Sequence, residues 1–123
     1  MTWSLLARDA DGAFGVAIAS RFFAVGVLCP RARSGVGALS TQALVNPLYA
    51  EPGLALLAQG TPPSEVVRLL TQQDAGREHR QLHLIDSFLN PTEFAQNSST
   101  PGVIMHLSTL YFVGFLLHYA RIL

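Results

Sequence analysis

The second residue of the chain, Thr2, carries two groups that can act together in catalysis. Removal of Met1, which a small second residue permits, would leave Thr2 with a free α-amino group beside its hydroxyl. Such an amine has a reference pKa of about 7.7 to 8.0, so it can serve as a base near neutral pH while the hydroxyl serves as a nucleophile. Alternatively, Thr2 only begins a β-strand, where threonine is common. The elements that hold Thr2 decide between these roles.

A hairpin is predicted over residues 2–20. Two apolar runs flank residues 9–12 (DADG), which supply positive φ and side-chain-to-backbone hydrogen bonds. Antiparallel pairing about this turn carries Thr2 opposite about Ala19, within one residue of register. We therefore expect Thr2 to meet Ser20 and Arg21 at the end of the second strand.

Two amide side chains flank the end of a third predicted strand, residues 35–42. Gln42 and Asn46 could donate hydrogen bonds to an oxyanion. The alternative is that they satisfy backbone groups in the turn that follows. Gly35 and Gly37 do not form a dinucleotide-binding fingerprint, because that motif needs a third glycine and residue 40 is serine.

Histidines at positions 79 and 83 flank Gln81 on a fourth predicted strand, residues 81–86. Strand alternation would place His79, Gln81 and His83 on one face, which we interpret as solvated. A metal site would need a third and a fourth ligand that the spacing does not supply. No metal ion or other cofactor is predicted.

Composition narrows the possible partners and chemistry. The net charge is zero and 13% of residues are charged, so electrostatics favours neither nucleic acid nor an anionic membrane. The absence of lysine excludes Schiff-base chemistry and a lysine base. The single Cys29 lies among apolar residues, which predicts a buried thiol with a raised pKa and no internal disulfide. The first residues lack a basic leader, so a cytoplasmic location is expected.

Two helices separate the third strand from the fourth. Residues 54–59 predict a short helix that follows the punctuation at Pro52 and Gly53 and stops at Gly60. A second helix, capped by Thr61 or Ser64, should end by residues 74–76. The apolar segment 22–28, beside the hairpin, is expected to be buried.

The composition changes after Asp86. Residues 87–102 are rich in Asn, Ser, Pro and Gly and predict a loop or linker. Residues 103–123 are mostly apolar and predict a helix or tail. We consider a core or oligomer-interface helix, a membrane contact through residues 103–120, which is not favoured, and a non-native sequence produced by a reading-frame change.

A longer pattern runs from Thr2 to Asp86. It comprises TWSLLARD at 2–9, GVAIASRFFAVG at 15–26, GVGA at 35–38, TQA at 41–43, NP at 46–47, Tyr49 and GREHRQL at 76–82. This pattern resembles domain-of-unknown-function family 1028, which is similar to the N-terminal-nucleophile (Ntn) hydrolases. The resemblance implies an α+β fold, an αββα sandwich, over residues 1–86. The sandwich is expected to be incomplete, because the chain supplies too few strands and helices.

The resemblance also implies roles for individual residues. Thr2 would be the nucleophile, and Ser20 and Arg21 end the paired strand, where Ntn enzymes such as proteasome subunits carry an aspartate followed by serine and arginine. Arg31 or Arg33 falls near their catalytic lysine, although arginine cannot relay a proton. A small amide or peptide-like substrate would be hydrolysed. The alternative is a non-catalytic half-domain that acts through a homo-oligomer or a membrane tail.

Overall fold

The computed structural model describes residues 2–88, 91–95, 104–107 and 118–122. Its strands are β1 (Thr2–Arg8), β2 (Phe14–Ser20), β3 (Pro30–Arg33), β4 (Gly37–Ala43), β5 (Arg80–Asp86), β6 (Pro91–Ala95), β7 (Ile104–Leu107) and β8 (His118–Ile122). Its helices are α1 (Val25–Leu28), α2 (Ala50–Ala58) and α3 (Pro63–Gln72), with 3₁₀ turns η1 (Pro47–Tyr49) and η2 (Arg77–His79).

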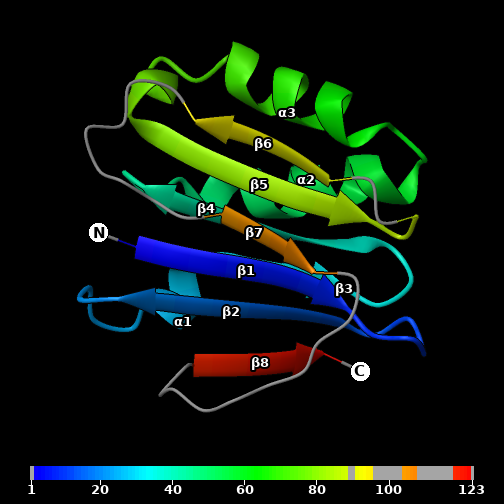
Figure 1. The fold of residues 1–123 in the computed structure, drawn as a ribbon. Coiled ribbons are helices and arrows are strands. Elements are labelled where there is room, and N and C mark those ends of the chain that lie inside the picture. The colour runs from blue at the N-terminus through cyan, green and yellow to red at the C-terminus, as the bar shows by residue number, and fades with distance from the viewer. Residues whose placement is uncertain (1, 89–90, 96–103, 108–117, 123) are drawn as a thin grey trace.

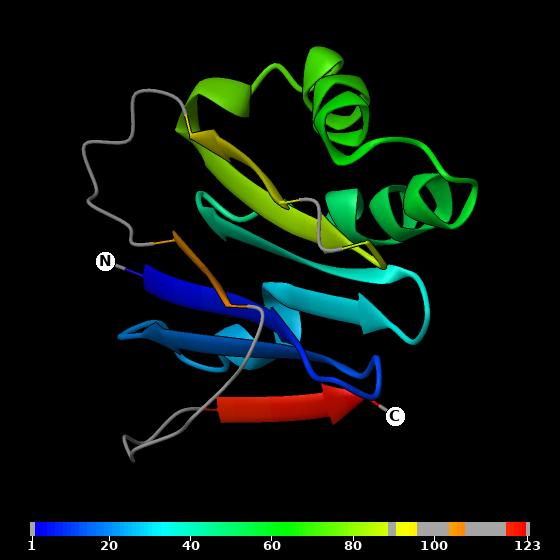
Figure 2. The ribbon, with the colours of Figure 1, turned by 45° about the vertical axis from the view of Figure 1, so that its right-hand side comes forward.

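The strands form two four-stranded sheets, in the orders β7-β1-β2-β8 and β3-β4-β5-β6. The sheets pack face to face, with β1 and β2 against β4 and β2 also against β3. Helices α2 and α3 both cover the outer face of the second sheet (Figures 1 and 2). The described residues thus form an α+β fold, as predicted, arranged as helix, sheet, sheet.

The predicted hairpin is confirmed. Thr2 pairs with Ser20, one residue from the expected partner Ala19. In the turn, Asp9 Oδ1 accepts hydrogen bonds from the backbone nitrogens of Asp11 (3.0 Å) and Ala13 (2.8 Å). Gly12 has φ of 89°, a conformation that glycine adopts without strain.

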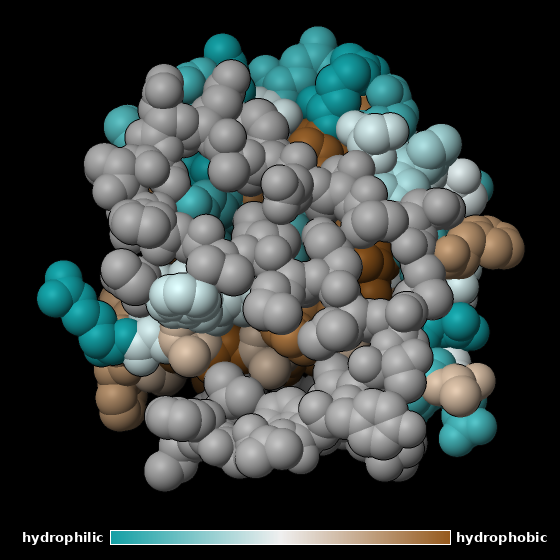
Figure 3. Space-filling view, viewed as in Figure 1, coloured by the Kyte–Doolittle hydropathy of each residue, from teal (hydrophilic) through white to brown (hydrophobic). Residues whose placement is uncertain are grey.

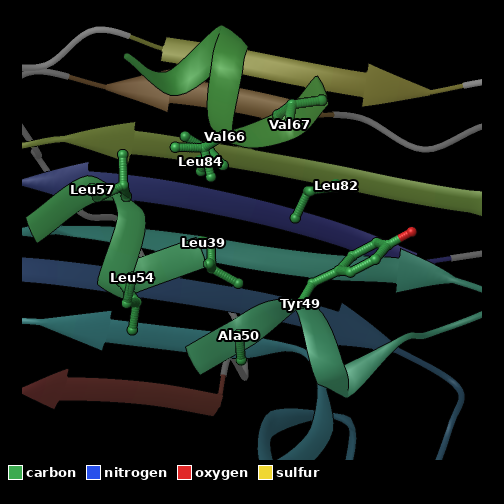
Figure 4. Close-up of a cluster of buried hydrophobic side chains, with 9 residues drawn as sticks. All are labelled: Leu39, Tyr49, Ala50, Leu54, Leu57, Val66, Val67, Leu82 and Leu84. Atoms are coloured by element: carbon green, nitrogen blue, oxygen red, sulfur yellow. The ribbon is translucent and has the colours of Figure 1, made fainter. Parts of the chain in front are cut away.

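The largest core lies between the helices and the second sheet. Nine buried side chains form it, as Figure 4 shows: Leu39, Tyr49, Ala50, Leu54, Leu57, Val66, Val67, Leu82 and Leu84. Each buried leucine or valine contributes roughly 1.5–3 kcal/mol. This core fixes β4 and β5, whose opposite faces point toward the first sheet.

Both predicted helices begin at other residues than expected. Helix α2 begins at Ala50 and runs through Pro52 and Gly53, since a proline in the first turn lacks only an N–H that has no partner in the helix. Helix α3 begins at Pro63, and its N-cap, Pro62, makes no side-chain capping bond, so neither Thr61 nor Ser64 caps it.

The expectation that residues 22–28 are buried is wrong. In α1 only Val25 is buried, while Phe23 is 92% exposed and Phe22 and Val27 are also exposed. A single helical turn can direct few side chains toward the protein, and the rest face solvent. Figure 3 shows apolar atoms on the surface near the end of β2, to which α1 is connected.

Within residues 87–123 the described segments 91–95, 104–107 and 118–122 are strands, whereas a loop or linker was expected over 87–102 and a helix or tail over 103–123. β6 lies within the expected linker and pairs with β5, and β7 and β8 flank the hairpin, parallel to β1 and antiparallel to β2. Short apolar runs do not distinguish strand from helix by periodicity, and pairing with an exposed strand edge favours the strand. Residues 108–117, within the expected helix, lie outside the described residues. No helix in the described ranges is long and apolar enough to cross a membrane.

Candidate functional site

The layer between the two sheets is apolar at one end and polar at the other. The apolar end contains Leu6, Phe14, Val16, Ala38 and Ile85. Strand alternation directs another set of side chains into the same layer at the opposite end: Thr2, Ser4, Ser20, Ser40, Gln42, Gln81 and His83. In Figure 1 this polar end is where β1 and β5 begin and β2 and β4 end.

Thr2 and Ser20 form the outer part of the polar end. Thr2 Oγ1 lies 3.0 Å from Ser20 Oγ, in a partly buried contact in which either hydroxyl can donate. Ser20 Oγ also accepts a hydrogen bond from the backbone nitrogen of Phe22 (3.1 Å). The hairpin therefore brings together the two hydroxyls that the sequence singled out.

Deeper in the layer, four polar side chains form a buried network. Ser4 Oγ donates to Gln42 Oε1 (2.6 Å) and lies 2.6 Å from His83 Nε2, and Gln42 Nε2 donates to Gln81 Oε1 (3.0 Å). His83 is 0% exposed and Ser4 is 5% exposed. The interpretation of His83 and Gln81 as a solvated strand face is wrong, because the first sheet covers that face.

Ser4 was missed by reasoning from the sequence. The available signal was its place two residues after Thr2, which strand alternation puts on the same face of β1. Gln42, a predicted oxyanion donor, is fully buried, and its amide is bonded to Ser4 and Gln81. Its contacts therefore tie β4 to β1 and β5.

The predicted arginines lie in different places. Arg21 directly follows Ser20 and is exposed. Arg33 is paired with Gly37 in the β3–β4 register, whereas the polar end lies at Ser40. Its guanidinium binds Glu51 of α2 at 3.1 Å. The structure thus does not bring Arg33 to Thr2.

Asn46 belongs to a second polar cluster, around Asp74. It caps η1 by accepting from the nitrogen of Leu48 (3.2 Å), and it donates to Asp74 Oδ2 (3.2 Å). Asp74 also accepts from the Tyr49 hydroxyl and from Arg80 Nε (2.9 Å). Of the two interpretations of Asn46, its contacts match the one in which it satisfies a turn.

The contacts of this cluster shift two pKa values in opposite directions. The Arg80 guanidinium, the Tyr49 hydroxyl and further donors hold the pKa of Asp74 well below its usual range. Burial, followed by the hydrogen bond to Asp74 and its charge, raises the pKa of Tyr49 to about 12. At neutral pH the carboxylate is charged and the phenol is neutral, which is the pairing that the hydrogen bond requires.

Cys29 is buried, as predicted. Burial raises the pKa of its thiol to about 11, and the charge of Arg31 offsets only part of this effect. A thiol with this pKa is protonated at neutral pH and is a poor nucleophile.

The two histidines do not share a strand face. His79 ends η2, outside β5, whereas His83 lies within β5. In the part of the chain that the structure describes, no three His, Cys, Asp or Glu residues gather as metal ligands would.

Comparison with known proteins identifies the family. No curated protein matches the chain. The crystal structure of a Silicibacter pomeroyi protein of the DUF1028 family superposes with a TM-score of 0.74 at 33% identity, covering 79% of this chain and 46% of that protein. The chain thus spans less than half the length of that protein.

The model of the family of unknown function DUF1028 matches residues 2–114. That range continues past Asp86, where we expected the resemblance to end, so the change in composition is not a family boundary. The chain therefore belongs to the family of unknown function DUF1028.

Proposed function

We propose that the chain is an amide hydrolase of the N-terminal-nucleophile type, with Thr2 as the reacting residue after removal of Met1. The observation that supports this best is the position of Thr2. It begins the hairpin at the polar end of the inter-sheet layer, and its hydroxyl lies 3.0 Å from that of Ser20 in a partly buried contact. A second hydroxyl can fix the rotamer of Thr2 while a substrate reaches it from solvent.

The proposed reaction uses both groups of Thr2. The neutral α-amine takes the hydroxyl proton as Oγ1 attacks the amide carbon. The C–N bond then breaks, the leaving amine receives that proton, and the acyl group remains on Oγ1 as an ester. Water attacks the ester, the α-amine accepts a proton from it, and the acid leaves as Oγ1 regains its proton.

The neighbours of Thr2 suggest supporting roles. Ser20 orients the nucleophilic hydroxyl through the bond described above. Arg21, which directly follows Ser20 and is exposed, would offer a partner for a carboxylate of the substrate. We therefore propose a small amide or peptide-like substrate, and we leave Arg33 out of the site.

Mass spectrometry of the purified chain tests the proposal. The intact mass should lack Met1, and a small β-lactone should add one acyl group to the peptide that begins at Thr2. Thr2→Ala should abolish this labelling and Thr2→Ser should retain it. Thr61→Ala, which removes a threonine from the loop between α2 and α3, should label like the wild type.

Two results would refute the proposal. One is a chain that keeps Met1, and the other is a folded chain whose free Thr2 does not react. Either result would favour the non-catalytic alternative, in which the chain acts by associating with another copy. Sedimentation of the same sample would then report its oligomeric state.

A further inference from the structure

The buried network at the polar end has a defined direction. The amide nitrogen of Gln42 donates to Gln81 Oε1, so its oxygen faces Ser4. A serine hydroxyl has one proton, and Ser4 donates it to Gln42 Oε1. The contact of 2.6 Å with His83 Nε2 must then be one in which Ser4 Oγ accepts. The donors therefore run from His83 through Ser4 and Gln42 to Gln81.

This direction decides what Ser4 can do. Activation of Ser4 as a nucleophile would require His83 Nε2 to accept the serine proton. Here Nε2 donates instead, and the serine proton is held by Gln42. With one bond accepted and one donated, both at 2.6 Å, the side chain is held in one orientation. This geometry suits a positioning group, not a reacting one.

Ser4 is also placed to act on Thr2. It lies two residues after Thr2 on the same face of β1, and its partners belong to β4 and β5 of the other sheet. The bond between Thr2 and Ser20 joins only strands of the first sheet. The hydrogen bonds of Ser4 thus link the start of β1, where Thr2 lies, to the second sheet.

We propose that Ser4 is a positioning residue for Thr2. His83 and Gln42 hold Ser4, so that the amine and hydroxyl of Thr2 keep a fixed position at the polar end of the layer between the sheets. The proposal rests on the proposed function. Displacement of a reacting group by about 1 Å can lower a rate about 100-fold. Loss of the anchor should therefore slow the chemical step at Thr2 and leave the binding of small reagents nearly unchanged.

Labelling kinetics with the β-lactone test this role. Its concentration dependence separates the binding constant from the maximal rate, in the full-length chain. Ser4→Ala should lower the maximal rate on the order of 100-fold with little change in binding, and Ser4→Thr should restore most of it. Ser40→Ala is the matched control, because Ser40 is equally buried in the same layer and its Oγ has no hydrogen-bond partner.

Hydrogen exchange adds a structural readout. Backbone amides of β1 should exchange faster in Ser4→Ala than in Ser40→Ala or the wild type. If Ser4→Ala does not fold, Ser4→Cys replaces it, since a thiol fills the site but is a weak donor and acceptor.

The outcomes separate the two proposals. A wild type that labels at Thr2, together with a Ser4→Ala chain that labels at the same rate, overturns the positioning role and leaves the proposed function intact. An equal loss in Ser40→Ala overturns it too, because any buried hydroxyl would then matter. A folded wild type that does not label overturns the proposed function and the positioning role with it. Slow labelling and faster β1 exchange in Ser4→Ala alone support the positioning role.

Discussion

Replacement of Asp74 by asparagine should destabilise the chain, because this carboxylate joins three elements. Its Oδ2 accepts hydrogen bonds from Asn46, which caps η1, and from Tyr49, which ends η1. It also accepts one from Arg80 at the start of β5. Its Oδ1 accepts from the nitrogen of Gly76 at 2.8 Å. Asparagine keeps the shape but places an amide where one oxygen stood, so it cannot accept all of these bonds.

The contacts set the size of the effect. The side chains of Asp74 and Arg80 are only 12% and 15% exposed, so their ion pair is poorly screened by solvent. Hydrogen bonds to charged groups contribute about 1.5–3 kcal/mol each, and they are not additive in a shared cluster. We expect Asp74→Asn to lower the free energy of unfolding by about 2–4 kcal/mol. For a chain of this size, that lowers Tm by on the order of 10 °C.

The pH dependence gives a second signature. The pKa of Asp74 is lowered in the folded state, so its contribution to stability is fully present above its unfolded pKa of about 3.9. That contribution is lost as the pH falls through the lower, folded pKa. The stability difference between wild type and Asp74→Asn should therefore be constant above about pH 5 and should shrink in more acidic solution.

Urea unfolding followed by circular dichroism from pH 3 to pH 8 measures both effects. Glu51→Gln is the matched control, because it makes the same chemical change in an exposed ion pair with Arg33. It should cost less than about 1 kcal/mol at every pH. If Asp74→Asn were as mild as this control, the cluster would not carry the stability that we assign to it.

Three further predictions concern single residues. Gly37→Ala should destabilise the chain by about 2–3 kcal/mol in urea, because a Cβ there would lie 2.4 Å from the backbone oxygen of Ile85; an equally stable variant would show that the strands separate readily. Cys29 has its pKa raised to about 11, so iodoacetamide at pH 8 should alkylate it only after unfolding, and rapid alkylation of the native chain would contradict its burial. Arg33→Met should change stability by less than about 1 kcal/mol and leave β-lactone labelling of Thr2 unchanged; a loss of labelling would mean that this arginine reaches the site after all.

Local chemistry explains why the hairpin was predictable. The turn at residues 9–12 sets the register, and a two-residue period then fixes which face each side chain of β1 and β2 takes. The meeting of Thr2 with Ser20 follows from these two facts alone. The helices were located for similar reasons, although the start of α2 at Ala50 depended on how Pro52 fits a first turn.

The environment of His83 was not predictable in the same way. A strand pattern shows that Gln81 and His83 share a face, but not whether a second sheet covers that face. The covering strand, β1, lies at the far end of the sequence, and the contact between Ser4 and His83 joins residues 79 positions apart. The strands within residues 87–123 were missed for a related reason, since their partners lie in β1, β2 and β5.

The polar network at the start of β1 is hard to explain by stability alone. Apolar side chains fill the other end of the same layer, and an apolar layer is usually at least as stable as a buried polar one. A buried polar group that loses its partner is left unpaired at a cost in stability, and Ser40 Oγ in the same layer already has no hydrogen-bond partner. Unlike apolar contacts, hydrogen bonds are directional. The network therefore fixes one orientation of β1 against β4 and β5. A fixed orientation at this end matters most if Thr2 must hold a reacting atom in place. The comparison of Ser4→Ala with Ser40→Ala tests this point, since both remove a buried hydroxyl and only one removes the bonds.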